Sequence, residues 1–221
     1  MDPLLNRIFD LTKKARENQS ERGSAPPTQL IERQKDLQVH LSRWLDTYNS
    51  STKFLRGHGS MDEEKAHVIL SVYHTMATIM ANTCLSPDDE MAFDLHMDRF
   101  SYIIKQLLKL GTLDPIVRFQ ASGETFVNMS KSVMDMGWNA PLYFVAVKCR
   151  VHQIRLQAVQ LLESAFHREG IWDSRVTACV SRRIMEVEER DFYRTRTTTD
   201  GLQLQIPIPE PLRAEGKKCG F

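Results

Sequence analysis

The chain has 221 residues, of which 42% are hydrophobic and 26% are charged, a composition typical of soluble globular proteins. Its 29 basic and 28 acidic side chains nearly cancel, so no charge excess would draw it to nucleic acid or to an anionic membrane. No apolar run reaches the roughly 18 residues that span a bilayer, and the N-terminus lacks the apolar core of a secretory signal. We therefore expect an intracellular protein without membrane contact.

The N-terminal part of the chain predicts two helices separated by a linker. Residues 2–18 have leucine and isoleucine at helical spacing, which indicates a short amphipathic helix. Residues 19–27 contain Gly, Ser and two Pro, which favour a linker. Thr28 is suited to cap a second helix that extends to Tyr48. Its inward-facing residues are expected to be Leu30, Leu37, Leu41, Trp44, Leu45 and Tyr48.

Further helices are predicted between residues 60 and 136. One begins at Ser60 or Asp62 and ends within 82–85. The stretch 86–90 then places a proline and three carboxylates where a new helix N-terminus favours them, and this helix is expected to stop at Gly111. Residues 112–136 predict two shorter helices with a break at 122–123.

The segment 141–189 predicts three more helices. An apolar helix at 141–149 leads into a turn, and the next helix has its buried face at Ile154, Ala158, Leu161, Leu162 and Ala165. Gly170 is expected to cap the C-terminus of this helix. Asp173 or Ser174 begins the third helix, with Trp172 packed as a buried hydrophobic staple. The inward side of that helix is expected to carry Val176, Val180, Ile184 and Val187.

Beyond residue 194 the pattern changes, because the Asp200-Gly201 pair between alternating polar and apolar residues predicts a β-hairpin. The expected fold is therefore all-α, an array of antiparallel helical hairpins resembling an α-solenoid, with a short C-terminal β-hairpin. The expected divisions are an N-terminal helix at 1–18, a linker at 19–27, a helical domain at 28–194, and a hairpin and tail at 195–221.

A search for catalytic and metal-binding motifs assigns no catalytic residue, metal or cofactor. The metalloprotease, serine-hydrolase and phosphate-loop motifs are absent, and the four cysteines include no closely spaced pair of zinc ligands. His67 and His74 can share one side of a helix, but no third ligand is near them in the sequence. Cys149 lies between two cations that would favour a reactive thiolate, although burial in an apolar helix is the simpler interpretation.

Several residues of the segment 141–189 resemble the C-terminal part of the fungal zinc-cluster transcription factors. They are Pro141, Leu142, Tyr143 and Phe144, then Lys148, Cys149 and Arg150, then Arg168, Glu169, Gly170, Trp172, Asp173 and Ser174, and finally 184–189. In that family a six-cysteine binuclear zinc cluster binds DNA, and a long helical regulatory region follows it. The six-cysteine cluster is absent from this chain.

The resemblance implies a non-catalytic, helical regulatory domain of a transcription regulator in the nucleus. Its partners would be proteins, a second copy of itself or a small-molecule effector, and a methionine-lined pocket could hold such an effector. Because the zinc cluster is absent, we expect no sequence-specific DNA binding by this chain. Two alternatives remain open, a generic interaction scaffold and an all-helical enzyme. The enzyme would use a site formed by Tyr73, His74, His96 and Cys149.

Overall fold

The computed structural model describes residues 1–22, 26–55, 61–113, 137–165, 168–170 and 172–189. The chain forms two compact units. Unit 1 comprises Met1–Leu113 with Lys148–Val151, and unit 2 comprises Asp114–Val147 with His152–Phe221. This division differs from the expected one, because the N-terminal helix belongs to unit 1 and the expected domain 28–194 is shared between the two units.

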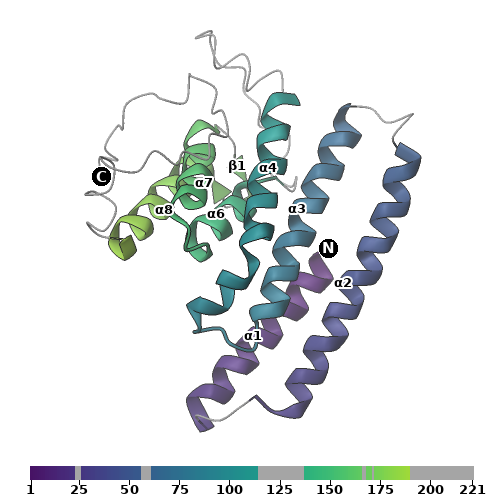
Figure 1. Cartoon of the computed structure of the whole chain (residues 1–221), viewed down its shortest axis with the longest axis vertical. Coiled ribbons are helices and arrows are strands. Elements are labelled where there is room, and N and C mark those ends of the chain that lie inside the picture. The colour runs from purple at the N-terminus through teal and green to yellow at the C-terminus, as the bar shows by residue number, and fades with distance from the viewer. Residues whose placement is uncertain (23–25, 56–60, 114–136, 166–167, 171, 190–221) are drawn as a thin grey trace. The chain divides into compact units, whose positions relative to one another are not determined.

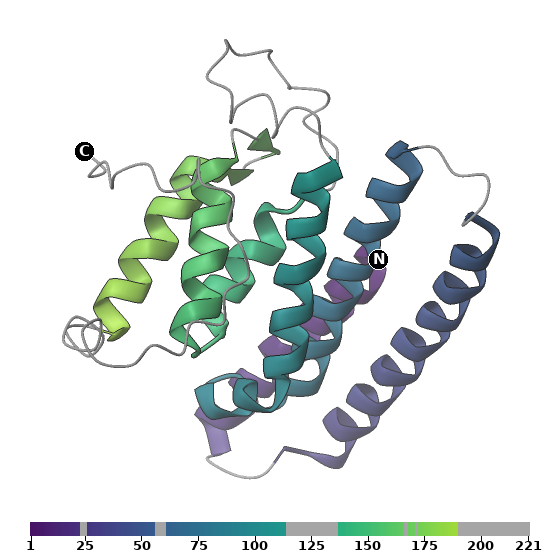
Figure 2. The same cartoon turned by 45° about the horizontal axis from the view of Figure 1, so that its top comes forward.

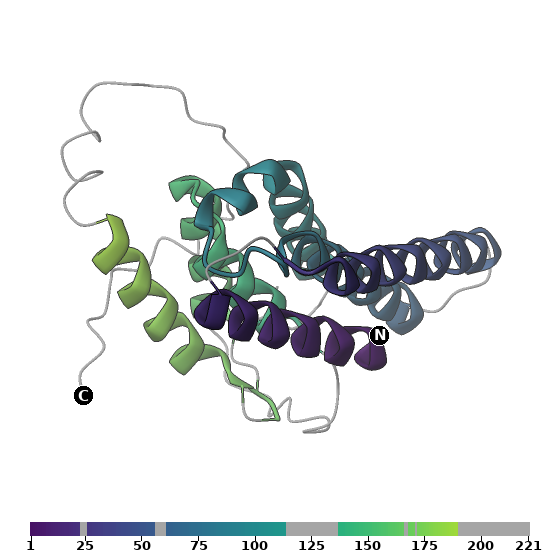
Figure 3. The same cartoon turned by 90° about the horizontal axis from the view of Figure 1, so that it is seen from below.

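The described part of unit 1 consists of helices that pack around a central one. They are α1 (Asp2–Arg22), α2 (Thr28–Leu55), α3 (Met61–Thr83), the 3-10 helix η1 (Glu90–His96) and α4 (Met97–Leu113). Successive long helices run in opposite directions, and α3 packs against α1, α2 and α4 (Figure 1). Helices α1, α2 and α3 lie side by side (Figure 3). The central position of α3 explains why this helix buries residues around most of its circumference.

Apolar residues of α1, α2 and α3, together with Cys84, form the hydrophobic core at one side of unit 1, because their spacing of three and four residues places them on facing stripes. The buried members are Ile8, Leu11, Ala15, Leu30, Leu37, Leu41, Ala77, Ala81 and Cys84. Helices η1 and α4 bury Phe93, Phe100, Ile103, Ile104, Leu107 and Leu110. The inward positions expected for Leu30, Leu37 and Leu41 are confirmed, whereas Leu45 is exposed.

Two helices of unit 1 extend further than their sequence predicts. Helix α1 continues to Arg22, four residues into the expected linker, because the first strong helix breaker is Gly23. Helix α2 continues to Leu55 for the same reason, since no Gly or Pro occurs before Gly57. In both helices, the polar residues that precede the first Gly continue the helix.

The helix restart predicted at 86–90 is present, but its first turns are 3-10 rather than α. Asp89 caps η1, and its side chain accepts a hydrogen bond from the backbone N–H of Met91. Helix α4 then passes Gly111 and ends at Leu113. The helices expected further along, up to residue 136, lie outside the described residues.

Unit 2 contains α6 (Asn139–Lys148, whose last residue belongs to unit 1), α7 (His152–Ser164), β1 (Arg168–Glu169), β2 (Trp172–Asp173) and α8 (Ser174–Glu189). Helices α7 and α8 pack side by side, as Figure 2 shows. The buried apolar residues are Leu142, Val145, Ala146, Ala158, Val159, Leu162, Ala178 and Met185. The expected burial of Ala158 and Leu162 is confirmed.

A short antiparallel hairpin precedes α8, where the sequence predicts only a break between helices. Strands β1 and β2 pair with Arg168 opposite Asp173 and Glu169 opposite Trp172. Gly170 has a φ of 56°, the left-handed value expected of it, but it serves the hairpin turn because α7 already ends at Ser164. An all-α fold with a short β-hairpin is therefore confirmed, and the hairpin expected at 195–221 lies outside the described residues.

Helix α8 buries a different face from the one that the sequence predicts. Val176, Val180 and Val187 are 63%, 44% and 56% exposed, and Ile184 is half-buried. The buried residues are instead Ser174, Thr177, Ala178, Ser181 and Met185. Both sets recur at helical spacing, and the set with smaller side chains faces inward, where it permits α7 to approach closely. Trp172 is half-buried rather than enclosed in a core.

Candidate functional site

The residues of the sequence motif that lie in α6 support the hairpin of unit 2. Pro141 and Leu142 are buried, whereas Tyr143 and Phe144 are half-buried. The Tyr143 ring packs against the Trp172 indole, with ring centroids 5.4 Å apart and an interplanar angle of 52°. Tyr143 and Trp172 therefore join α6 to the hairpin through a tilted ring contact.

Glu169 is the chemically most distinctive residue of the hairpin, because its carboxylate is buried at the N-terminus of α6. The side chain accepts hydrogen bonds from the backbone N–H groups of Trp138, at 2.8 Å, and Asn139, at 3.1 Å. Burial raises the pKa of the Glu169 carboxyl, while the backbone hydrogen bonds oppose that shift. A Cβ atom on Gly137 would lie 2.0 Å from the carboxylate oxygen, so any other residue at position 137 would displace this carboxylate.

The last motif residues begin α8. Of the two cap candidates in the sequence, Asp173 and Ser174, it is Asp173 that caps the helix, by accepting hydrogen bonds from the backbone N–H groups of Arg175 and Val176. The Ser174 hydroxyl donates to the carbonyl oxygen of Ala165. Arg168, which is exposed, occupies the strand position opposite Asp173. These residues form a structural framework at the start of α8.

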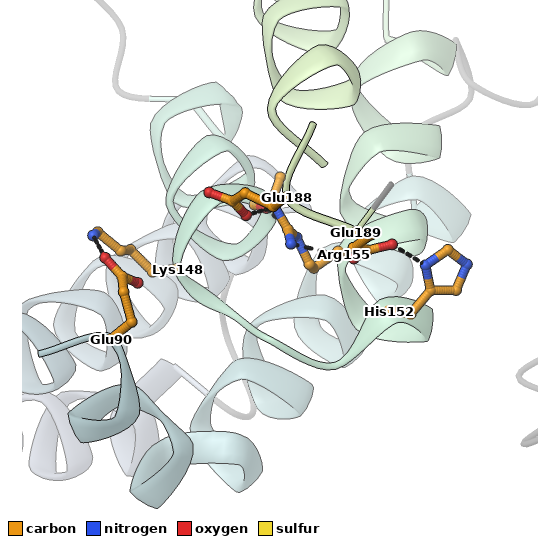
Figure 4. A network of polar contacts seen from close by, with 7 residues as sticks. Glu90, Lys148, His152, Arg155, Glu188 and Glu189 are labelled. Carbon is orange, nitrogen blue, oxygen red and sulfur yellow. Dashed lines mark hydrogen bonds and ion pairs between the residues drawn. The ribbon is translucent and has the colours of Figure 1, made fainter. Parts of the chain in front are cut away.

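Lys148, Cys149 and Arg150 belong to unit 1, where they pack on η1. Lys148 contacts the Glu90 carboxylate at 2.8 Å, as Figure 4 shows, and its Nζ lies 5.0 Å from the centre of the Phe93 ring. Arg150 pairs with Asp94 at 2.8 Å. The Cys149 thiol is fully buried, with its sulfur 3.9 Å from that of Met97. Burial of this thiol, rather than the reactive alternative, is confirmed.

Arg155 forms a polar network in unit 2 that the sequence analysis did not predict (Figure 4). The side chain is only 3% exposed, and its Nε donates to the Ala146 carbonyl oxygen at 2.8 Å. Its other nitrogens contact Glu188 at 2.6 Å and Glu189 at 3.2 Å. His152 also contacts Glu189, at 2.5 Å. Because Arg155 shares the helix face of Ala158, Val159 and Leu162, its position among buried residues was a signal in the sequence.

In unit 1, four aromatic rings from α2 and α3 stack in the order His74, Trp44, Tyr48 and His67. The ring centroids of neighbours are 5.0, 5.4 and 3.9 Å apart, with interplanar angles of 10°, 15° and 12°. The rings of Trp44 and Tyr48 therefore lie between His67 and His74, so these two histidines are not adjacent as a shared metal site would require. Burial lowers the pKa of both His67 and His74.

The residues considered for an enzyme site, Tyr73, His74, His96 and Cys149, are all buried. His74 Nε2 lies 3.0 Å from the Leu41 carbonyl oxygen, whereas His96 Nδ1 lies 3.0 Å from the Arg99 guanidinium. Burial, followed by the Arg99 charge, lowers the pKa of His96. Tyr73 is buried on α3. Within the described ranges, no group of three or more His, Cys, Asp or Glu side chains is placed to hold a metal ion.

A shallow pocket of about 370 Å³ lies between α1 and α2 of unit 1. It is lined by Asn6, Arg7, Asp10, Leu11, Arg33 and Leu37, and contains no methionine. Arg7 is paired with Asp36 and Asp10 with Lys14. The pocket is therefore not the methionine-lined effector site that the sequence offered as an alternative to ordinary packing of the methionines.

The outer row of α8, consisting of Val176, Val180, Ile184 and Val187, is the other candidate surface. Its side chains lie on one face because steps of four, four and three residues return to similar angles around a helix. Exposed Arg175 precedes the first residue of the row, and exposed Arg183, Glu186 and Glu188 accompany its second half, where Arg183 pairs with Glu186. An apolar row with charged neighbours is typical of a protein contact surface.

No protein-family model, curated protein or solved structure matches this chain. Among the residues that the structure describes, no helix combines the length and the apolar character needed to cross a bilayer.

Proposed function

We propose that this chain is a helical regulatory domain of a transcription regulator, acting in the nucleus through contacts with other proteins. In this proposal the chain neither catalyses a reaction nor reads DNA bases. The resemblance of residues 141–189 to the fungal zinc-cluster factors supplies the biological context, and no other observation favours the enzyme or the generic scaffold over it.

The observation that carries the proposal is the exposure of the outer row of α8. Aliphatic side chains normally occupy the buried side of an amphipathic helix, and a surface row of them favours a further contact. The nearly neutral net charge of +1 also fits a domain that contacts proteins rather than phosphate backbones.

The motif residues have a supporting role in this proposal. Glu169 and Asp173 accept backbone hydrogen bonds at the starts of α6 and α8, so they position α8 rather than touch a partner. Substitution of either should reduce regulation only to the extent that it unfolds unit 2. Substitution within the outer row should reduce regulation and leave the fold intact.

A reporter assay tests the proposal. The full chain is fused to an unrelated DNA-binding domain, and transcription is measured from a promoter carrying the cognate site. We expect transcription to change by several-fold relative to the DNA-binding domain alone, and Val180→Glu to remove most of that change. Val39→Glu, at a 46% exposed position on α2, is the matched control and should keep the activity.

Two outcomes would contradict the proposal. One is a fusion that is expressed in the nucleus and leaves transcription unchanged. The other is turnover of a substrate by the purified chain. Nanomolar, zinc-dependent binding of a specific DNA sequence in a gel shift would overturn the separate statement that the chain does not read DNA.

A further inference from the structure

The pocket between α1 and α2 combines an apolar floor with a polar rim. The two leucines that line it, Leu11 and Leu37, are each only 2% exposed and form the floor. Arg7 and Arg33 precede these leucines by four residues, so each helix presents an arginine one turn away from a floor leucine. The exposed side chains that form the rim are Asn6, Arg7, Asp10 and Arg33. An apolar floor with a few polar groups around it is the usual composition of a small-molecule site.

Two of the four rim residues are already neutralised within the chain. Arg7 pairs with Asp36 at 2.5 Å, and Asp10 pairs with Lys14 at 2.7 Å. Each pair has no net charge, so neither determines the charge of a ligand.

Arg33 leaves one positive charge at the pocket. Within the described part of the chain, its guanidinium makes neither a hydrogen bond nor an ion pair, and the same is true of the Asn6 amide. The hydrogen bond from Lys14 and, more weakly, the Arg33 charge lower the pKa of Asp10, which is consistent with a guanidinium at the rim. A guanidinium binds a carboxylate through two parallel hydrogen bonds, and a side-chain amide can donate a further one.

We propose that this pocket binds a small monocarboxylate with an apolar body, whose carboxylate pairs with Arg33 and whose body covers Leu11 and Leu37. The single unbalanced charge favours one carboxylate over a multiply charged phosphate. The volume of about 370 Å³ lies near the lower end of the roughly 300–1,000 Å³ of ligand pockets, which favours a small ligand. The inference goes beyond the proposed function and does not depend on it, because binding is measured on the purified chain.

The shape of the pocket sets the expected affinity. Because it is shallow, a ligand with about ten non-hydrogen atoms stays partly in water and gains only part of the available binding energy. We therefore expect a Kd of about 0.1–1 mM.

Titration of the isotope-labelled full chain with sodium octanoate, up to about 5 mM and followed by amide NMR spectra, tests the proposal. The amide signals that shift saturably should be those of α1 and α2 around the pocket. Shifts that fail to saturate, or that are spread evenly over unit 1 and unit 2, would show adventitious surface binding and would overturn it.

Two arginine variants locate the carboxylate. Arg33→Gln should weaken octanoate binding by about five- to tenfold, because it removes the charge that pairs with the ligand. Arg43→Gln is the matched control, since Arg43 is also exposed on α2 but does not line the pocket, and it should bind as wild type. Circular dichroism confirms that both variants fold. Equal affinity of wild type and Arg33→Gln would overturn the pairing.

Two further ligands test the proposal without changing the protein. Octanol keeps the apolar body without the charge, and acetate keeps the charge without the body. Each should bind at least about five times more weakly than octanoate, because each makes only one of the two contacts. Octanol that binds as tightly as octanoate would exclude a role for Arg33, and acetate that does so would exclude a role for the leucine floor.

Discussion

Two buried serines on the inner face of α8 differ in whether the hydroxyl has a hydrogen-bond partner. The Ser174 hydroxyl donates to the Ala165 carbonyl oxygen, whereas the Ser181 hydroxyl has no partner among the described residues. A buried hydroxyl without a partner costs free energy, and one with a partner stabilises by about 1 kcal/mol.

We therefore predict opposite effects of the same substitution at these two positions. Ser181→Ala should raise the free energy of unfolding by about 0.5–1 kcal/mol, because it removes a polar group without a partner and improves helix propensity. Ser174→Ala should lower it by about 1 kcal/mol. Urea denaturation followed by circular dichroism measures both. A loss of stability in Ser181→Ala would show that its hydroxyl does have a partner.

Also at the residue scale, Glu169 should make the free energy of unfolding depend on pH. Because burial raises the pKa of this carboxyl above its unfolded value of about 4.5, the native state holds the proton more tightly than the unfolded state. Its contribution to stability is present below that unfolded value and is lost as pH rises through the native pKa.

Glu169→Gln should remove this dependence. Between pH 4 and 7, wild type should lose stability relative to the glutamine variant as pH rises, because only the wild type then buries a charge. Unfolding free energies at several pH values provide the comparison, in which the titration of all other groups cancels. A difference that is constant with pH would mean that the backbone hydrogen bonds fully offset burial.

At the scale of elements, α8 depends on its cap. Asp173 accepts hydrogen bonds from two backbone N–H groups of the first turn. Asp173→Ala should therefore lower the free energy of unfolding by about 1 kcal/mol, whereas Asp173→Ser should cost only a few tenths. Hydrogen exchange of the first-turn amides locates the change. Equal losses in both variants would argue against the capping role.

The same helix shows how far a sequence can predict this fold. The start of α8 follows from capping chemistry, and part of the buried faces of α2 and α7, such as Leu37, Leu41, Ala158 and Leu162, follows from periodicity. The orientation of α8 does not, because its small residues and its aliphatic residues both recur at helical spacing. Packing against α7 decides between these faces, and packing is a tertiary property.

The candidate site was also predictable only in part, because some of its contacts are local in the sequence and others are not. The sequence narrowed the cap of α8 to Asp173 or Ser174, and the structure decides for Asp173. The roles of Glu169 and Arg155 could not, because each depends on backbone groups at Asn139 and Ala146 that lie elsewhere in the chain. Two-residue strands such as β1 and β2 are also too short to have a period.

At the scale of the whole molecule, the two units should respond to acid in opposite ways. In unit 1, burial lowers the pKa of His67, His74 and His96, so the native state binds protons at these side chains less readily than the unfolded state does. The unfolded state binds protons first as pH falls through about 6.5, and unit 1 loses stability there. In unit 2, the raised pKa of the Glu169 carboxyl has the opposite effect, because the native state holds this proton more tightly than the unfolded state and acid therefore stabilises the unit.

Hydrogen exchange measured between pH 7 and 5, corrected for intrinsic rates, tests this prediction. Protection in α3 should fall with acid more steeply than protection in α7. Arg99→Gln should reduce the acid sensitivity of unit 1, because the Arg99 charge lowers the pKa of both His74 and His96. Parallel losses in α3 and α7 would contradict this account.

The four residues Lys148–Val151 belong to unit 1 although the chain on both sides of them belongs to unit 2. A gene fragment that ends at Leu113 would therefore encode every long helix of unit 1 but omit the cations that neutralise Glu90 and Asp94. Extending this fragment by a few codons would not add residues 148–151, which would have to be supplied on a separate, co-expressed segment. Neither unit is therefore one continuous stretch of the sequence.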